Sequence, residues 1–181
     1  MEAELAILVV DDDPDVALAA RYALAGAVAR TDSAVSLEGV EQTIQAGRYA
    51  GVLLDMNFVA GDSSGRAGID GLARIRAADP SLAVVLMTAY GGVQLAVEAL
   101  KRGAFDFVLK PWKNDRLVEA MTAACGVTAA RREARSATLD EMEREAIRRA
   151  LAEHGGNISR AAEALGVTRP ALYRKIEKHG L

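Results

Sequence analysis

Short apolar runs alternate with amphipathic stretches along the first two thirds of this 181-residue chain. A short apolar run rich in β-branched residues is typical of a strand that is covered on both faces. The sequence predicts strands at residues 5–10, 27–31, 51–54, 82–87 and 105–109. It predicts helices at residues 14–25, 37–46, 69–78 and 93–102, and from about residue 114. Alternating strands and helices require a parallel sheet with helices on both faces, so the predicted fold class is a doubly wound α/β domain.

Helix-starting and helix-stopping residues support several of these boundaries. Asp13 followed by Pro14 predicts an N-cap and a first helical residue, so a helix begins directly after the first strand. Gly47 is expected at the C′ position that closes the second helix. The Gly/Ser/Asp-rich residues 61–65 predict a loop before the third helix.

Polar side chains follow four of the predicted strands, namely Asp11, Asp12, Asp55, Thr88 and Lys110. Taken singly, each has an ordinary explanation, because an Asp after a strand is commonly a helix cap and a Lys is commonly solvated. Taken together, they converge on the carboxyl edge of the sheet, where open α/β domains bind ligands. The coincidence indicates a functional site.

The acids at this edge favour phosphoryl chemistry assisted by a cation. Asp55 lies at the centre of the edge, and a carboxylate there can attack phosphorus to give an acyl phosphate. Because the donor is anionic, its approach requires charge neutralisation. Mg²⁺ prefers oxygen ligands, and we expect it on Asp11, Asp12, Asp55 and the backbone carbonyl of Asn57.

Three further residues are candidates for binding the phosphoryl group. Lys110 can pair with one phosphoryl oxygen, and the Thr88 hydroxyl can donate a hydrogen bond to another. Ala89 is small and would leave the group accessible. An aspartyl-phosphate hydrolase is an alternative, but its usual Asp-x-Asp pair is missing at residues 55–57.

The pattern of the chain changes near residue 126. Residues 126–137 carry little apolar periodicity, and they are either an extension of the fifth helix or a linker. Thr138 and Glu141 fit a capping box, which predicts that a new helix begins there. That helix is expected to end at residues 155–156.

A helix-turn-helix is predicted at the C-terminal end. Asn157 is expected to cap a short helix, and a Gly-containing turn separates it from a third helix at residues 169–179. Cations on the last helix suit phosphate groups and guanine edges. The candidate DNA contacts are Thr168, Arg169, Arg174, Lys175 and Lys178. A small basic bundle for protein contacts is the alternative, and charge alone does not separate the two.

Composition adds a location and a charge asymmetry. No apolar run approaches the ~20 residues that span a bilayer, and the acidic N-terminal residues lack a signal-peptide pattern, so we expect a cytoplasmic protein. Residues 1–125 hold 11 Lys and Arg against 17 Asp and Glu, a net charge of −6. Residues 126–181 hold 11 against 8, a net charge of +3. This asymmetry indicates two functions on one chain.

The strand-end motifs resemble the receiver domain of bacterial response regulators over residues 4–124. The motifs are Asp11-Asp12, Asp55, Thr88-Ala89 and Lys110-Pro111. The resemblance implies a strand order of 2-1-3-4-5, Asp55 as the phosphoacceptor for a histidine kinase, and the acid pair as Mg²⁺ carboxylates. It also implies that Thr88 and Phe107 form a switch pair through which phosphorylation remodels the surface around the fifth strand.

One stretch departs from the receiver pattern. Receivers usually have Met-Pro shortly after the phosphorylated Asp, whereas residues 56–59 contain no proline and a Gly/Ser-rich insertion delays Gly71. The insertion within residues 56–70 either shields the phosphoryl group, contacts a partner, or is a tolerated surface loop. Together with residues 86–91 and 107–112, it resembles a subgroup of NtrC-like receivers.

The C-terminal segment resembles the Fis-type helix-turn-helix over residues 139–181, through residues 156–162, 165–169 and 172–175. The resemblance implies a homodimer formed through the first tail helix and DNA recognition by the third. NtrC-like activators carry an ATPase domain between these parts, but this sequence has no Gly-x-x-x-x-Gly-Lys-Ser/Thr loop. The direct junction resembles the short regulators of the RegA/PrrA/ActR type.

These observations predict a phosphorylation-controlled, DNA-binding response regulator of a two-component system, with no enzymatic activity beyond phosphoacceptor chemistry. Residues 1–125 are expected to form the receiver domain, residues 126–137 the connection and residues 138–181 the DNA-binding domain. The expected partners are a sensor histidine kinase, double-stranded DNA, a second copy of the chain and RNA polymerase. No interaction with a membrane is expected. The alternative is a signalling adaptor whose receiver controls protein contacts and whose tail only dimerises.

Overall fold

The structure is a computed structural model, and it describes residues 5–58, 65–89 and 93–181. The chain divides into two compact units, Met1–Arg131 and Arg132–Leu181. Of the loop predicted at residues 61–65, all but Gly65 lies outside the described residues. Within the described part of the chain, no helix is both long enough and apolar enough to cross a membrane.

The first unit contains a five-stranded parallel sheet with the order β2-β1-β3-β4-β5. The strands are β1 (Ala6–Val10), β2 (Arg30–Ala34), β3 (Gly51–Asp55), β4 (Val84–Ala89) and β5 (Asp106–Lys110). The helices are α1 (Pro14–Leu24), α2 (Val40–Gly47), α3 (Arg66–Ala78), α4 (Val93–Lys101) and the start of α5 (Asn114–Glu153). The predicted fold class and strand order are both confirmed.

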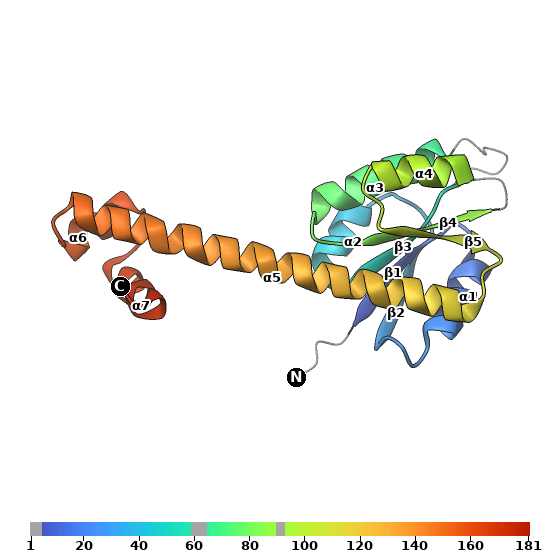
Figure 1. The fold of residues 1–181 in the computed structure, drawn as a ribbon, viewed down its shortest axis with the longest axis horizontal. Coiled ribbons are helices and arrows are strands. Elements are labelled where there is room, and N and C mark those ends of the chain that lie inside the picture. The colour runs from blue at the N-terminus through green and yellow to red at the C-terminus, as the bar shows by residue number, and fades with distance from the viewer. Residues whose placement is uncertain (1–4, 59–64, 90–92) are drawn as a thin grey trace. The chain divides into compact units, whose positions relative to one another are not determined.

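Two hydrophobic cores form on opposite faces of the sheet, because successive strand residues point to opposite sides. On β1, Leu8 and Val10 pack toward α2 and α3, whereas Ile7 and Val9 pack toward α1 and α5. Figure 1 shows α2, α3 and α4 on one side of the sheet and α1 and α5 on the other. These four side chains are fully buried, so β1 holds the acids that follow it in a fixed place.

The second strand lies three residues later than the predicted residues 27–31, because β2 begins at Arg30 and ends at Ala34. β2 lies at the edge of the sheet and pairs only with β1, so its side chains are exposed or half-buried. A strand at an exposed edge does not need the apolar run that marks a buried strand. The apolar Val28 lies outside the strands and packs against the core beneath α1 and α5.

The second helix is shorter than predicted. α2 begins at Val40 rather than at residue 37. Gly47, which was expected to follow the helix, is its last residue, and Arg48 adopts the left-handed conformation with φ of 48°. A Cβ atom on Gly47 would collide with the ring of Tyr49, so side-chain packing rather than backbone conformation requires a glycine there.

The third helix begins at Arg66, one turn earlier than the predicted residue 69. Its first turn lies against the backbone that follows β3. The Gly68 N–H donates to the Met56 carbonyl at 3.2 Å, and a Cβ atom on Gly68 would lie 2.6 Å from Met56 Cα. A glycine therefore permits this close approach, which extends the helix beyond its apolar pattern.

The helix α5 runs without interruption over 40 residues. Residues 126–137 are helical, and the prediction of a new helix that begins at Thr138 is wrong. The Thr138 hydroxyl donates a hydrogen bond to the Ala134 carbonyl at 3.0 Å. A threonine in a helix interior commonly bonds the carbonyl one turn earlier, so the capping motif has no capping role here.

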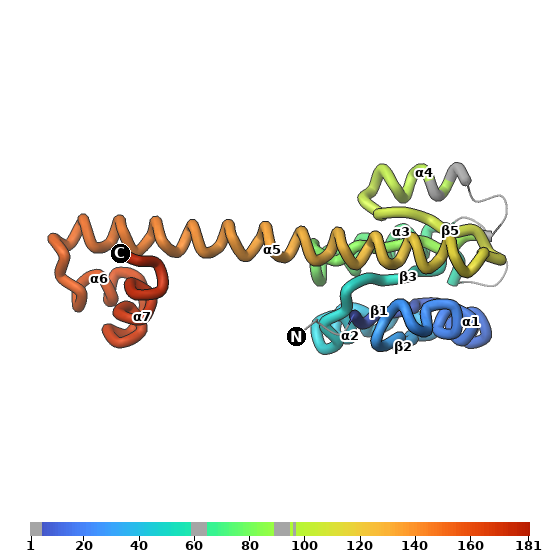
Figure 2. The backbone as a smooth tube through the Cα atoms, turned by 60° about the horizontal axis from the view of Figure 1, so that its bottom comes forward, coloured from blue at the N-terminus to red at the C-terminus, as the bar shows by residue number. Residues whose placement is uncertain are grey.

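The second unit packs α6 (Ile158–Ala164) and α7 (Arg169–His179) against the C-terminal part of α5, as Figure 2 shows. Its core consists of Ile147, Ala150, Ala161, Ala162 and Leu172. The side chains of Asn157 and Thr168 cap α6 and α7, and they accept hydrogen bonds from backbone N–H groups at 3.1 and 3.4 Å. The predicted helix-turn-helix is confirmed.

Candidate functional site

Three carboxylates meet at the carboxyl edge of the sheet. Asp11 follows β1, Asp12 lies beside it, and Asp55 is the last residue of β3. One carboxyl oxygen from each lies within 4.8 Å of the other two. Asp11 and Asp55 are buried, whereas Asp12 is exposed to solvent. The structure therefore brings together the three side chains that the sequence predicts as cation ligands.

Lys110, the last residue of β5, joins two of these carboxylates. Its Nζ lies 2.6 Å from Asp11 Oδ2 and 2.7 Å from Asp55 Oδ1. Charge-assisted contacts of this length allow two like charges to lie side by side. The Lys110 side chain is 22% exposed, so the ammonium group reaches the buried acids and remains open to an incoming ligand.

Backbone N–H groups fix the orientation of the two buried acids. The Asp13 N–H donates to Asp11 Oδ1 at 2.9 Å, and the Asn57 N–H donates to Asp55 Oδ2 at 2.8 Å. Each carboxylate thus has one oxygen bound by the backbone and the other by Lys110. In the described part of the chain, the side-chain Oδ1 of Asn57 is buried without a hydrogen-bond partner. This buried amide oxygen belongs to the residue whose N–H holds Asp55.

Burial and neighbouring charges shift the pKa values of Asp11 and Lys110. Burial raises the pKa of Asp11 above its ordinary value, and the hydrogen bond from Lys110 offsets part of the increase. Burial by itself lowers the pKa of Lys110, but the hydrogen bonds and charges of Asp11 and Asp55 outweigh it, and the pKa is raised. The ammonium group is therefore protonated at neutral pH and can pair with an anion.

The donor set fits a hard divalent cation. The cluster of Asp11, Asp12 and Asp55 offers carboxylate oxygens, which Mg²⁺ prefers. It includes no cysteine or histidine, the ligands that favour zinc. A cation held there would neutralise the charge that gathers when an anionic group approaches Asp55.

The remaining predicted residues of this site lie on β4 and β5. Thr88 is buried near the end of β4, and Ala89, the last residue of β4, pairs in register with Lys110. Phe107 on β5 lies opposite Leu86, so Thr88 and Phe107 point to the same face of the sheet. Phe107 is half-buried and packs against the core on that face. The predicted switch pair is therefore carried by neighbouring strands.

A second group of candidate residues lies on α7. Arg169, Tyr173 and Arg174 are exposed there. The Arg169 guanidinium lies over the Tyr173 ring at 5.7 Å from its centroid, and its Nη2 lies 3.3 Å from the Tyr173 hydroxyl. Tyr173 was missed as a candidate, although its position one turn after Arg169 is a signal for such a pair.

Two predicted DNA contacts bind acids of α5. Lys175 contacts Glu143, and Lys178 Nζ lies 2.7 Å from Asp140 Oδ1. The sequence does not predict these pairs, because their members are 32 and 38 positions apart and meet only when α7 packs on α5.

Comparison with known families agrees with this geometry. Residues 7–122 match the family of the response regulator receiver domain. The chain belongs to the response regulators. Residues 138–179 match the Fis family of bacterial regulatory proteins, so only residues 123–137 separate the two matched segments of this regulator. An ATPase domain is absent between them.

Curated relatives of this response regulator include longer transcriptional regulators. The C4-dicarboxylate transport transcriptional regulatory protein DctD of Pseudomonas aeruginosa is 33% identical over 172 residues, which cover 91% of this chain and 35% of the relative. The nitrogen assimilation regulatory protein NtrX of Azorhizobium caulinodans is 37% identical over 131 residues, which cover 71% of this chain and 28% of the relative. The chain spans about a third of the length of these relatives.

Solved receiver domains share the fold of the first unit. The receiver domain of NtrX from Brucella abortus is 32% identical, with a TM-score of 0.60, and the match covers 66% of this chain and 98% of that structure. A receiver domain from Bacteroides fragilis is 33% identical, with a TM-score of 0.61, and the match covers 68% and 98%. The sheet edge that carries the three carboxylates therefore lies within a domain with the receiver fold.

Proposed function

We propose that this chain is a phosphorylation-controlled DNA-binding regulator of a two-component system that acts in the cytoplasm. The observation that carries the proposal is the presence of the Asp55 cluster and a Fis-type helix-turn-helix on one chain. In this proposal residues 1–125 form the receiver domain and residues 138–181 the DNA-binding domain. Residues 126–137 of α5 join them.

Asp55 is the proposed phosphoacceptor. One of its carboxylate oxygens attacks the phosphorus of a phosphohistidine on a sensor kinase, and the phosphorus–nitrogen bond breaks. The imidazole nitrogen keeps the electron pair and takes up a proton. The Asn57 N–H and Lys110 hold the carboxylate, and Lys110 then pairs with a phosphoryl oxygen. Mg²⁺ held by Asp11, Asp12, Asp55 and the backbone carbonyl of Asn57 would supply charge neutralisation.

Thr88, Ala89 and Phe107 are proposed to read the phosphorylation state. The Thr88 hydroxyl would donate to a phosphoryl oxygen, and Ala89, a small residue, would leave the group accessible. Movement of Thr88 would change the space available to Phe107, because both side chains lie on the same face of neighbouring strands. A local charge would thereby shift the population of a two-state surface.

The proposed DNA-binding surface is α7. The contacts predicted from the sequence are Thr168, Arg169, Arg174, Lys175 and Lys178, of which Arg169 and Arg174 are exposed and Lys175 is paired with Glu143. A homodimer is supported by two exposed apolar side chains on α5, Leu139 at 58% and Met142 at 65%. RNA polymerase is a further candidate partner. The chain would have no enzymatic activity beyond accepting and losing the phosphoryl group.

Phosphate incorporation tests the phosphoacceptor. The purified chain is incubated with radiolabelled acetyl phosphate and Mg²⁺, and Asp55→Asn is expected to abolish labelling. Asp70→Asn, at an exposed position of α3, is the matched control and should label like the unmodified chain. Undiminished labelling of Asp55→Asn would refute the assignment.

Fluorescence anisotropy on duplex DNA tests the output. Binding to labelled genomic fragments is measured with and without Mg²⁺ and beryllofluoride, a phosphoryl mimic. Tighter, salt-sensitive binding with the mimic supports the proposed regulator. Equal binding in both states would place the switch at another contact, and no binding in either state would favour the adaptor.

A further inference from the structure

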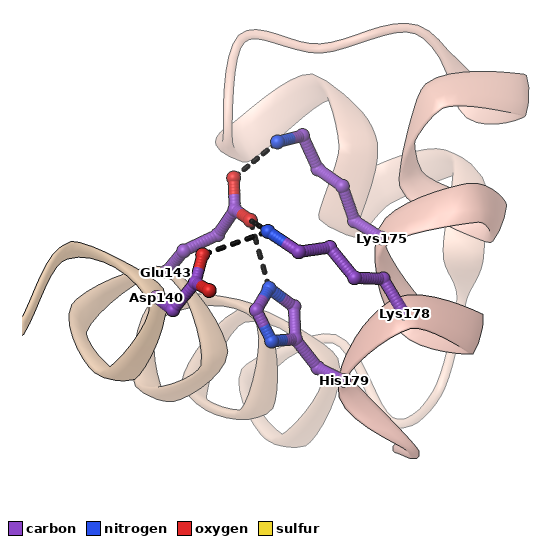
Figure 3. Close-up of polar contacts among 5 residues, drawn as sticks. All are labelled: Asp140, Glu143, Lys175, Lys178 and His179. Atoms are coloured by element: carbon purple, nitrogen blue, oxygen red, sulfur yellow. Dashed lines mark hydrogen bonds and ion pairs between the residues drawn. The ribbon is translucent and has the colours of Figure 1, made fainter. Parts of the chain in front are cut away.

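Three side chains of α7 converge on one carboxylate of α5. Lys175 Nζ contacts Glu143 Oε1, and His179 Nε2 lies 2.7 Å from Glu143 Oε2. Lys178 Nζ lies 3.6 Å from Glu143 Oε2 and 2.7 Å from Asp140 Oδ1. Figure 3 shows these side chains, with Asp140 and Glu143 on α5 and the other three on α7. The ammonium groups of Lys175 and Lys178 contact the acids, so the arrangement is a network of ion pairs between α5 and α7 rather than a metal site.

Arg174 and Lys175 are neighbours in the sequence, but they lie in different environments. Lys175 and His179 are one turn apart on the side of α7 that faces α5, and the His179 side chain is only 7% exposed. The Lys175 side chain is 36% exposed. Arg174 is exposed. Adjacent positions are about 100° apart around a helix axis, so Lys175 on the side that faces α5 is directed away from the exposed side that carries Arg174 as long as Glu143 holds it.

The contacts of Lys175 and Lys178 differ in how readily a DNA phosphate could replace them. Lys178 and Asp140 are 54% and 53% exposed, so water and salt screen this pair and a phosphate can compete for the lysine. Glu143 is 30% exposed and binds Lys175 and His179 together. Removal of Lys175 from Glu143 would therefore disturb the packing of α7 as well as one ion pair.

The ionisation of Glu143 agrees with this contact. Hydrogen bonds with His179 and then Lys175 lower the pKa of the Glu143 carboxyl to about 2. The carboxylate is therefore charged throughout the pH range in which DNA binding is measured, and it remains available to hold the lysine.

We propose that Glu143 is a positioning residue for DNA recognition, and that Lys175 is a structural cation of the α5–α7 contact rather than a DNA contact. Glu143 fixes α7 through Lys175 and His179. Arg174, on the exposed side of α7, contacts the phosphate backbone. This inference rests on the proposed DNA-binding function, and it divides the basic residues of α7 into two classes.

The salt dependence of DNA binding separates the two classes, because each phosphate contact contributes about −0.9 to the slope of log K against log salt concentration. The full chain, R174M and K175M are titrated onto a labelled mixed-sequence duplex at several salt concentrations. R174M is expected to make the slope shallower by about 0.9, whereas K175M leaves it unchanged. A K175M slope as shallow as that of R174M would overturn the inference.

Removal of the acid gives an independent measurement. E143Q releases Lys175 toward the duplex, so the slope is expected to become steeper by about 0.9. E141Q, at an exposed position of the same helix, is the matched control and should retain the original slope. Equal slopes for E143Q and E141Q would contradict the role of Glu143. If E143Q does not fold, which circular dichroism will reveal, the comparison of R174M with K175M decides alone.

Different results would refute the proposed DNA-binding function and the role of Glu143 and Lys175. If the unmodified chain binds no duplex at any salt concentration, the proposed DNA-binding function is refuted, and the inference with it. If the unmodified chain binds and K175M makes the slope shallower, only the inference about Glu143 and Lys175 is refuted.

Discussion

Thr128 is a buried polar residue within the segment that the sequence marks only as a linker or helical extension. It is 1% exposed. Its hydroxyl oxygen accepts a hydrogen bond from the Ala83 N–H at 2.9 Å and donates to the Ala124 carbonyl at 3.1 Å. The sequence gives no sign of this role, because Ala83 is 45 positions away and the surrounding residues lack an apolar pattern. Thr128 therefore ties α5 to the residue just before β4.

Replacement of Thr128 by valine keeps the shape of the side chain and removes both hydrogen bonds. The Ala83 N–H would be left buried without a partner, so we expect a loss of about 1–3 kcal/mol in the free energy of unfolding. Urea denaturation of the full chain measures the change. Thr122→Val, at an exposed position of α5, should stay within about 0.5 kcal/mol of the unmodified chain. Equal stability of the two variants would exclude an anchoring role for Thr128.

Tyr173 is predicted to orient Arg169 for DNA binding. Tyr173→Leu removes the ring and the hydroxyl that contact the guanidinium, and an exposed cation–π contact contributes about 0.5–1 kcal/mol. We expect the dissociation constant for genomic duplex fragments to rise about two- to five-fold, as measured by anisotropy. Tyr173→Phe keeps the ring and should lose less. Tyr22→Leu, at a 73% exposed tyrosine of α1, is the control, and an effect as large as that of Tyr173→Leu would count against a specific role.

At the scale of elements, the sequence predicts the positions of buried strands more reliably than those of exposed strands and helices. The strands β1, β3, β4 and β5 were found because apolar side chains cover them on both faces. The edge strand β2 was displaced because its residues are polar and half-buried. The length of α5 was missed because a local capping motif at Thr138 competes with a helix that continues through it.

The residues of the candidate sites likewise divide into those that the sequence locates and those whose partners it does not reveal. Asp11, Asp12, Asp55, Thr88 and Lys110 were found together because each lies at or next to the carboxyl end of a strand, and parallel strands bring these ends to one edge. The partners of Lys175 and Lys178 were not found, since they depend on how α7 packs on α5. Tertiary packing decides which cations are already paired.

The contact between α5 and α7 is expected to weaken in acid. The pKa of Glu143 is lowered from 4.5 to about 2 in the folded chain, so its stabilising effect is fully present above pH 4.5. That effect is lost as the pH falls from 4.5 toward 2, and solvent exposure keeps it modest. Amide hydrogen exchange in α7 of the full chain, followed as the pH is lowered, should detect earlier opening of this contact. E143Q should lack this part of the pH dependence, and an identical profile in both chains would contradict the assignment.

At the scale of the whole molecule, the exposed apolar side chains of α5 predict self-association. Leu139 and Met142 lie one turn apart on α5, and they are 58% and 65% exposed. Replacement of both by glutamate would put two charges into a dimer contact, so the variant should sediment as a monomer under conditions in which the unmodified chain dimerises. Ala137→Glu, at a neighbouring exposed position, is the control. Unchanged sedimentation of the double variant would place the dimer contact on another surface.

The exposure of the middle of α5 has a consequence for proteolysis. From residue 129 to residue 139, every position except 132 is exposed, so these turns have little tertiary support. A helix held mainly by its own backbone opens locally at a low free energy, and open backbone is what a protease cuts. Trypsin should therefore cleave first in this stretch, for example after Arg135, and leave two resistant fragments, each with its own core. Because a partner seated on Leu139 and Met142 would cover part of the same stretch, the rate of that first cut should also report association between copies of the chain.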